Sequence, residues 1–224
     1  MSKKQYIRQL KKSIESLSKW DSSGKAFGHL RNLRNKKTDR IYEFFCYIKI
    51  IDDLKKNYDI ELVEGINGKI FPQGPASKKG WAKFILKDKI NGNILLQACF
   101  GTSVKLSASP KTTFAADISF QKSSANDDPD ERDVELIMDA KYKESNSTKL
   151  DIKTIKEFAK SVQDFGVHSI KAGKIIFDKL KDIEVNCLLT NGNTIDIHEQ
   201  YCKNNCLQQI GRFDCDGRKF NVIG

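Results

Sequence analysis

The pattern of apolar and polar positions predicts helices in the first quarter of the chain. Over residues 5–20, apolar side chains recur every three to four positions, which is the period of an amphipathic helix. A short basic helix is expected over 27–36. A third helix is expected to begin at Thr38 or Asp39, either of which can cap it. Its apolar stripe is broad, so we expect the first half of this helix to be buried.

The middle of the chain predicts strands. Glycine and proline residues mark 57–80 as irregular, and 122–133 is a polar loop. An Asn-Gly pair within 89–93 is typical of a tight hairpin turn. Strand-like runs of apolar residues are expected at 80–88, 93–101, 112–121 and 134–143.

The last third of the chain alternates between the two patterns. It predicts a helix over 148–166, a buried strand over 183–192, a helix over 196–210 and a final hairpin turning at Asp216 and Gly217. This order predicts an α/β (α+β) fold, with a mixed central β-sheet flanked by helices. Its first part is expected to be antiparallel, with a βαβ crossover later. We expect a basic helical arm over 1–37 and one domain over 38–224.

Charge is concentrated at the N-terminus. The formal net charge is +10, and residues 1–40 hold twelve Lys and Arg against Glu15, Asp21 and Asp39. A basic segment of this kind fits a polyanion such as nucleic acid. The alternative is a solvated helix surface that keeps the protein soluble.

The compartment is inferred from the apolar segments of the chain, and the state of the cysteines follows from the compartment. No apolar segment typical of a signal peptide follows the charged start, and no apolar run approaches the roughly 20 residues of a membrane span. We therefore expect a cytoplasmic protein without membrane contact, whose six cysteines are free thiols. Steps of four place His198, Cys202 and Cys206 on one helix face, which favours core packing over a zinc site.

The run "VELIMDAKYK" (134–143) carries the candidate chemistry. In a strand, Asp139 and Lys141 point to the same face, about 6–7 Å apart. Asp117 lies in an earlier strand among small residues that leave room for its carboxylate. Carboxylates brought together repel unless a cation compensates them, and magnesium prefers such hard oxygen ligands. The alternative is a simple Asp–Lys ion pair at the end of a strand.

Asp117 followed by Asp139-Ala140-Lys141 resembles the PD-(D/E)XK nuclease superfamily, which has the restriction-endonuclease-like fold. The run "RIYEFFCYIKIIDDLKK" resembles the helix that precedes the core of McrC-type restriction nucleases, and Glu43 matches the acid of that helix. The run "NCLLTNGNTIDIHEQYC" is similar to the late strand and helix of Mrr-like nucleases.

The resemblance extends over about 38–208, with departures. Ala116 stands at the position of the proline that gives the motif its name, a position that varies in this superfamily. Val167 stands where the RecB and Cas4 branch has a tyrosine, which argues against that branch. The chain has no nucleotide-binding loop, so any energy-dependent behaviour requires a separate partner.

The resemblance implies a Mg²⁺-dependent endonuclease that hydrolyses DNA in restriction or anti-phage defence, with Mn²⁺ able to substitute. Asp117 and Asp139 are expected to ligate the metal with help from the Ala140 carbonyl. Glu43 is expected to bind a second ion or an ordered water, and the alternative for Glu43 is a salt bridge to a nearby Arg or Lys. Lys141 is expected to position the attacking water.

The resemblance also leads us to expect contacts with DNA phosphates and a second subunit. The side chains expected to meet DNA are Arg31, Arg34, Lys143, Lys156 and Lys160. The alternative for the lysines is that they are solvated charges on a helix surface. Because cutting both strands requires two active sites, we expect a homodimer or a partner subunit in a defence complex. Competing functions are a nucleic-acid-binding subunit that does not cleave, a junction or transposon-end nuclease, and an RNase.

Overall fold

The computed structural model describes residues 2–16, 25–68, 70–164, 175–214 and 220–223. Its α-helices are α1 (Lys3–Ser16), α2 (Lys25–Leu33), α3 (Thr38–Leu54), α4 (Ile152–Asp164) and α5 (Glu199–Asn204). Its strands are β1 (Tyr58–Val63), β2 (Ala76–Ser77), β3 (Lys83–Asp88), β4 (Ile94–Phe100), β5 (Thr102–Leu106), β6 (Ser109–Ala115), β7 (Ile118–Lys122), β8 (Val134–Lys141), β9 (Asn186–Thr190), β10 (Leu207–Gly211) and β11 (Asn221–Ile223). Single 3₁₀ turns occupy Ile66–Gly68, Glu131–Asp133 and Asp196–His198.

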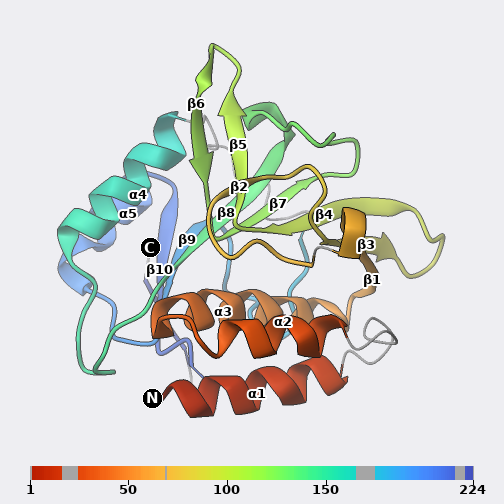
Figure 1. The fold of residues 1–224 in the computed structure, drawn as a ribbon. Helices are drawn as coiled ribbons and strands as arrows, with labels where there is room; N and C mark the ends of the chain where they lie inside the picture. The colour runs from red at the N-terminus through yellow and green to blue at the C-terminus, as the bar shows by residue number, and fades with distance from the viewer. Residues whose placement is uncertain (1, 17–24, 69, 165–174, 215–219, 224) are drawn as a thin grey trace.

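A large mixed sheet organises the molecule (Figure 1). In the described residues its order is β1-β3-β4-β7-β8-β9-β10-β11, and a smaller sheet has the order β2-β5-β6. In the large sheet, β1, β3, β4, β7 and β8 pair antiparallel in that order, whereas β8, β9 and β10 pair parallel. Helix α4 lies in the connection from β8 to β9, as a parallel crossover requires. The mixed α/β architecture expected from the sequence is therefore confirmed.

Helices cover both faces of the central strands. Leu136 and Met138 of β8 belong to a large core shared with α1, α2 and α3. Ile137, on the opposite face of the same strand, belongs to a second core shared with α4 and α5. Because side chains alternate along β8, this one strand contributes side chains to both cores. In Figure 1, α1, α2 and α3 stack on one side of the sheet, and α4 and α5 lie together away from them.

Helix α3 is buried on most of its surface, as its broad apolar stripe predicts. Its one buried charged side chain is Glu43, which is 9% exposed. The expected cap is wrong, because Lys37 is the N-cap residue and makes no side-chain capping bond. The Asp39 carboxylate instead accepts a hydrogen bond from the Arg40 amide at 2.8 Å. Among the described residues, no helix is long and apolar enough to cross a membrane.

The N-terminal helices share the main core with the rest of the chain. Leu10, Ile14 and Leu30 are buried in the same cluster as α3. The Tyr6 ring lies 5.5 Å from the Tyr42 ring, centroid to centroid. The exposed basic side chains of α1 are therefore backed by an apolar face that packs on α3, while the division at residue 37 stays a prediction.

The strand expected over 112–121 is broken into two. Its first part is β6, which pairs with β5 in the small sheet, and its second part is β7, which pairs with β4 in the large sheet. The break falls at Ala116 and Asp117. On the neighbouring strand Gly101 has a φ of 58°, a left-handed conformation that favours glycine. Its amide donates to the Asp117 carbonyl at 2.9 Å, so both strands leave the large sheet together.

Two further expectations are wrong in part. Strand β1 lies inside the segment 57–80 that was expected to be irregular, although Tyr58, Ile60 and Leu62 alternate with Asp59 and Glu61 as a strand requires. The predicted helix over 196–210 ends at Asn204, and β10 follows it.

Sheet pairing explains the early end of that last helix. Cys206 has a φ of 53°, which ends the helical conformation, and β10 then pairs with β9. Strand β11 pairs with β10 in an antiparallel arrangement, as the expected final hairpin requires. The turn expected at Asp216 and Gly217 lies outside the described residues.

Candidate acidic site at the end of strand β8

The end of β8 brings together an acid and a base, as alternation predicts. The Lys141 Nζ lies 2.5 Å from the Asp139 Oδ2. The Asp139 side chain is 16% exposed and that of Lys141 is 38% exposed. Both side chains therefore reach solvent from a strand whose Ala140 is buried between them.

Asp117 joins this pair from the break between β6 and β7. Its Oδ2 accepts a hydrogen bond from the Ala140 amide at 2.8 Å. Its carboxyl group also shares a hydrogen bond with Asp139. Two carboxyl groups from different strands thus lie close together, and the Lys141 ammonium group beside Asp139 offsets part of their repulsion.

The electrostatic state of Asp117 follows from that contact. Burial raises the pKa of Asp117 well above its usual range, and the neighbouring Asp139 and Glu43 raise it further. The hydrogen bond from the Ala140 amide acts in the opposite direction but does not compensate. Negative charge at this position is therefore unfavourable until a cation arrives.

Glu43 faces the same region from α3. Its Oε2 lies 2.6 Å from Arg40 Nη1, one turn earlier on the helix. Burial raises the pKa of Glu43, the Arg40 guanidinium lowers it, and the carboxylates of Asp39 and Asp139 raise it again. The ion pair with Arg40 is the structural alternative to a metal-binding role, so the expected metal role of Glu43 stays a prediction.

Lys141 remains an ammonium group in this setting. Burial by itself lowers the pKa of Lys141, but attraction from Asp139, Asp117 and Glu43 outweighs burial and raises it. A side chain in this state donates hydrogen bonds and stabilises negative charge. It is not available to accept a proton.

The neighbouring strand end anchors the backbone around Lys141. The Thr190 hydroxyl donates to the Lys141 carbonyl at 2.8 Å. The Asn191 side chain accepts from the Lys143 amide at 2.7 Å and donates to the Lys143 carbonyl at 2.8 Å. Both residues are fully buried, so they hold the strand end in place from β9.

These three contacts were not assigned from the sequence. Thr190 and Asn191 stand in the run that resembles Mrr-like nucleases. Their signal in the sequence was a hydroxyl and an amide side chain, adjacent to each other at the end of an apolar strand. The ion pair of Arg40 with Glu43 also had a signal in the sequence, because Arg40 lies three positions before Glu43 on one helix.

The residues expected to contact DNA are spread over several elements. Arg31 and Arg34 are exposed on or beside the end of α2, and Lys156 and Lys160 are exposed on α4. Lys143 follows β8, and its Nζ lies 3.4 Å from the Asp151 carboxylate. The structure thus brings Asp117, Asp139 and Lys141 together and leaves the expected phosphate contacts as predictions.

A metal at this site would be held by a pair of carboxylates. In the described part of the chain, no three Asp, Glu, His or Cys side chains converge as a ready metal cage. The directly contacting acids are Asp117 and Asp139, and the Ala140 carbonyl adjoins them. Magnesium commonly binds one or two carboxylates and keeps several waters, so a carboxylate pair fits its preferences.

The expected helix face of His198, Cys202 and Cys206 does not form. Helix α5 ends before Cys206, so the three side chains do not share one helical stripe. Cys202 is fully buried and accepts a hydrogen bond from the Gln209 amide group at 3.3 Å. Core packing, expected for these residues as a set, is thus observed for Cys202.

Two hollows lie at opposite ends of α3. The first, lined by Leu33, Arg40, Glu43 and Asp117 with the loop 72–74, has a volume of about 10 Å³, enough for roughly one water. The second, near Ser16 and the end of α3, has a volume of about 800 Å³.

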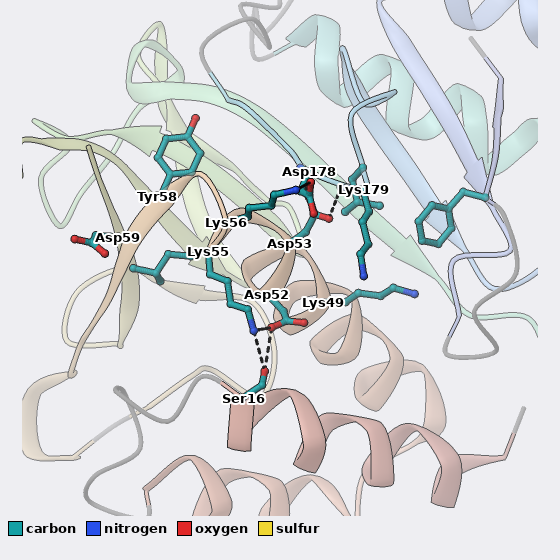
Figure 2. Close-up of a pocket in the computed structure, with 13 residues that line it drawn as sticks. Ser16, Lys49, Asp52, Asp53, Lys55, Lys56, Tyr58, Asp59, Asp178 and Lys179 are labelled. Carbon is teal, nitrogen blue, oxygen red and sulfur yellow. Dashed lines mark hydrogen bonds and ion pairs between the residues drawn. The ribbon is translucent and has the colours of Figure 1, made fainter. Parts of the chain in front are cut away.

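Figure 2 shows two ion pairs among the charged side chains that line the larger hollow. Lys55 lies 2.5 Å from Asp52, and Lys56 lies 2.6 Å from Asp178. The Asp53 carboxylate accepts hydrogen bonds from the backbone amides of Asp178 and Lys179, both at 2.8 Å. The larger hollow thus contains two ion pairs together with charged side chains outside them, such as Asp59 and Lys179.

No family model, curated protein or solved structure matches this chain. Only the geometry and electrostatics of the acidic site therefore bear on its function.

Proposed function

We propose that this protein is a metal-dependent nuclease of the PD-(D/E)XK type that hydrolyses DNA phosphodiester bonds. The observation that carries the proposal is the contact of the Asp117 and Asp139 carboxyl groups with the Lys141 ammonium group beside them. Lys141 compensates one of the two acids, and a bound divalent cation would compensate the other.

The donor set supports magnesium, with manganese as a substitute. Asp117, Asp139 and the Ala140 carbonyl would hold the ion, and Glu43 could serve a second ion or a water once it leaves Arg40. When bound, such an ion polarises a phosphoryl oxygen and lowers the pKa of a water.

The side chains of this protein have separable roles in the proposal. Lys141, kept protonated by its acidic neighbours, donates a hydrogen bond that orients the attacking water and stabilises the charge that develops on the phosphate. Thr190 is a positioning residue, since its bond to the Lys141 carbonyl holds the end of β8 in place.

The test is cleavage of supercoiled plasmid by the full chain with Mg²⁺, with Mn²⁺ and with EDTA. We expect nicking or linearisation with either metal and none with EDTA. Asp139→Ala should abolish cleavage, whereas Asp178→Ala, which alters an ion pair in the larger hollow, should leave the rate within about twofold. Cleavage by Asp139→Ala at the rate of the unaltered protein would falsify the assignment.

The finer parts of the proposal concern substrate and assembly. We place the activity in the cytoplasm, in restriction or anti-phage defence, with a second copy or a partner subunit supplying the second active site for double-strand cutting. A panel of duplex DNA, branched DNA and RNA measures substrate class. A protein that binds these substrates but cuts none with any metal would instead be a non-cleaving binding subunit.

A further inference from the structure

The N-terminal helix and the end of α2 form a groove with a basic lining. The groove has a volume of about 660 Å³ and is lined by Lys3, Lys4, Ile7, Arg8, Lys11 and Arg34. We call it the basic groove. Apart from the mostly buried Ile7, every lining side chain carries a positive charge.

Most of this charge is free to meet a ligand. Lys4, Arg8, Lys11 and Arg34 are exposed, and none of them forms an ion pair with another described residue. Lys4, Arg8 and Lys11 recur at about one helical turn, so they form a row along one side of α1. Lys3 differs, because its Nζ donates to the Lys36 carbonyl at 2.7 Å and ties α1 to the start of α3.

The basic groove lies beside the acidic site. Leu33, at the end of α2, lines the small hollow that also contains Glu43 and Asp117. The next residue, Arg34, lines the basic groove. On α1, Tyr6 lies 6.3 Å from the ring of Tyr142, which directly follows Lys141. The groove and the acidic pair are therefore neighbours at one end of the molecule.

We propose that the basic groove binds the phosphate backbone of a nucleic-acid strand and leads it to Asp117 and Asp139. A row of exposed cations with no acidic lining complements a line of phosphates. The groove reads no base sequence in this role, because phosphate contacts set position and not specificity. This inference rests on the proposed function for its substrate, but binding can be measured without cleavage.

The test compares two charge-matched variants of the full chain in an Asp139→Asn background with EDTA. The first, Lys4→Gln with Arg8→Gln and Lys11→Gln, neutralises the groove. The second, Lys55→Gln with Lys56→Gln and Lys179→Gln, removes three charges from the larger hollow. Fluorescence anisotropy with a labelled DNA duplex of about 30 base pairs is measured over a salt titration, and circular dichroism checks that each variant is folded.

We expect the groove variant to bind DNA at least tenfold more weakly, with a salt slope shallower by about 3, since each phosphate contact contributes about 0.9. The variant in the larger hollow should stay within about threefold. The single change Arg34→Gln should reduce the slope by about 1.

Equal losses in both triple variants would overturn the inference, because net charge alone would then explain binding. Unchanged DNA affinity in the groove variant, with lost binding to vesicles containing phosphatidylserine, would assign the groove to a membrane surface and also overturn it. If the groove variant loses DNA binding while the unaltered protein cuts nothing, the groove stands and the proposed nuclease function falls.

Discussion

The two ends of α3 carry charge in contrasting ways. At the far end, the larger hollow is lined by four basic and four acidic side chains, and two ion pairs join Lys55 to Asp52 and Lys56 to Asp178. At the near end, Asp117 and Asp139 contact each other, and Lys141 and Arg40 do not remove the excess of negative charge. The hollow with more space has the more evenly balanced charge.

The ion pairs at the far end contribute to stability, whereas the carboxyl pair at the near end opposes it and therefore calls for another explanation. Paired surface charges contribute at most about 1 kcal/mol each and are common on soluble proteins. A partly buried pair of carboxyl groups opposes folding when both are charged, and such arrangements are frequent at functional sites. The volume of a hollow is therefore a weaker guide here than the balance of charge within it.

The largest contrast is expected from removing one amine at each end. Lys141→Ala should lower the rate of metal-dependent DNA cleavage by about 10²–10³, because one preorganised donor is lost from the reacting phosphate. Lys56→Ala, a matched change at the far end, should leave the rate within about twofold. Single-turnover cleavage rates measure both, and equal effects at the two ends would remove the contrast.

The second-largest expected effect is that the Mg²⁺ affinity of the near end depends on pH. Burial and then Asp139 raise the pKa of Asp117, so a cation must displace the shared proton to bind. Apparent Mg²⁺ affinity should therefore rise with pH, by up to about tenfold per pH unit, from the usual carboxyl range up through the raised pKa.

Calorimetric Mg²⁺ titrations at several pH values measure this dependence. Asp117→Asn, which cannot hold the shared proton, should bind the ion weakly with a flatter dependence. An affinity of the unaltered protein that does not change with pH would show that no proton is displaced.

The smallest effects should be opposite changes in thermal stability. Because the folded-state pKa of Asp117 is raised, the folded state loses stability as pH rises from the unfolded-state pKa through the folded-state one. At pH 7.5 without metal, Asp117→Asn should remove this penalty and raise Tm by a few degrees, at about 2–4 °C per kcal/mol.

Replacing an aspartate at the far end should instead lower Tm. Asp53→Ala removes the acceptor of two backbone amides at 178 and 179, which costs about 1–3 kcal/mol. Thermal unfolding followed by circular dichroism measures both variants. A lower Tm for Asp117→Asn would mean that its carboxyl group stabilises the metal-free fold.

Local patterns predicted part of the site. The placement of Asp139 and Lys141 on one face of β8 follows from the period of a strand, which depends only on neighbouring residues. The mixed sheet followed from the order of periodic segments.

Other features depend on contacts between distant segments. Asp117 reaches the Ala140 amide because β6 and β7 pair with different sheets, and no local pattern announces that break. Asn191 supports Lys143 across 48 positions of sequence, so its role becomes visible only when β9 is placed beside β8. The end of the helix before Cys206 was missed because sheet pairing overrides local propensity.

The pairing of β8 with β9 also bears on how the protein is made. A growing chain that has left the ribosome as far as β8 already contains Glu43, Asp117 and Asp139, but one edge of β8 has no partner. The hydroxyl that supports the Lys141 carbonyl belongs to Thr190, the last residue of β9, and is synthesised much later. The acidic site therefore reaches its final form only when most of the chain has been translated, and truncated products should lack its geometry.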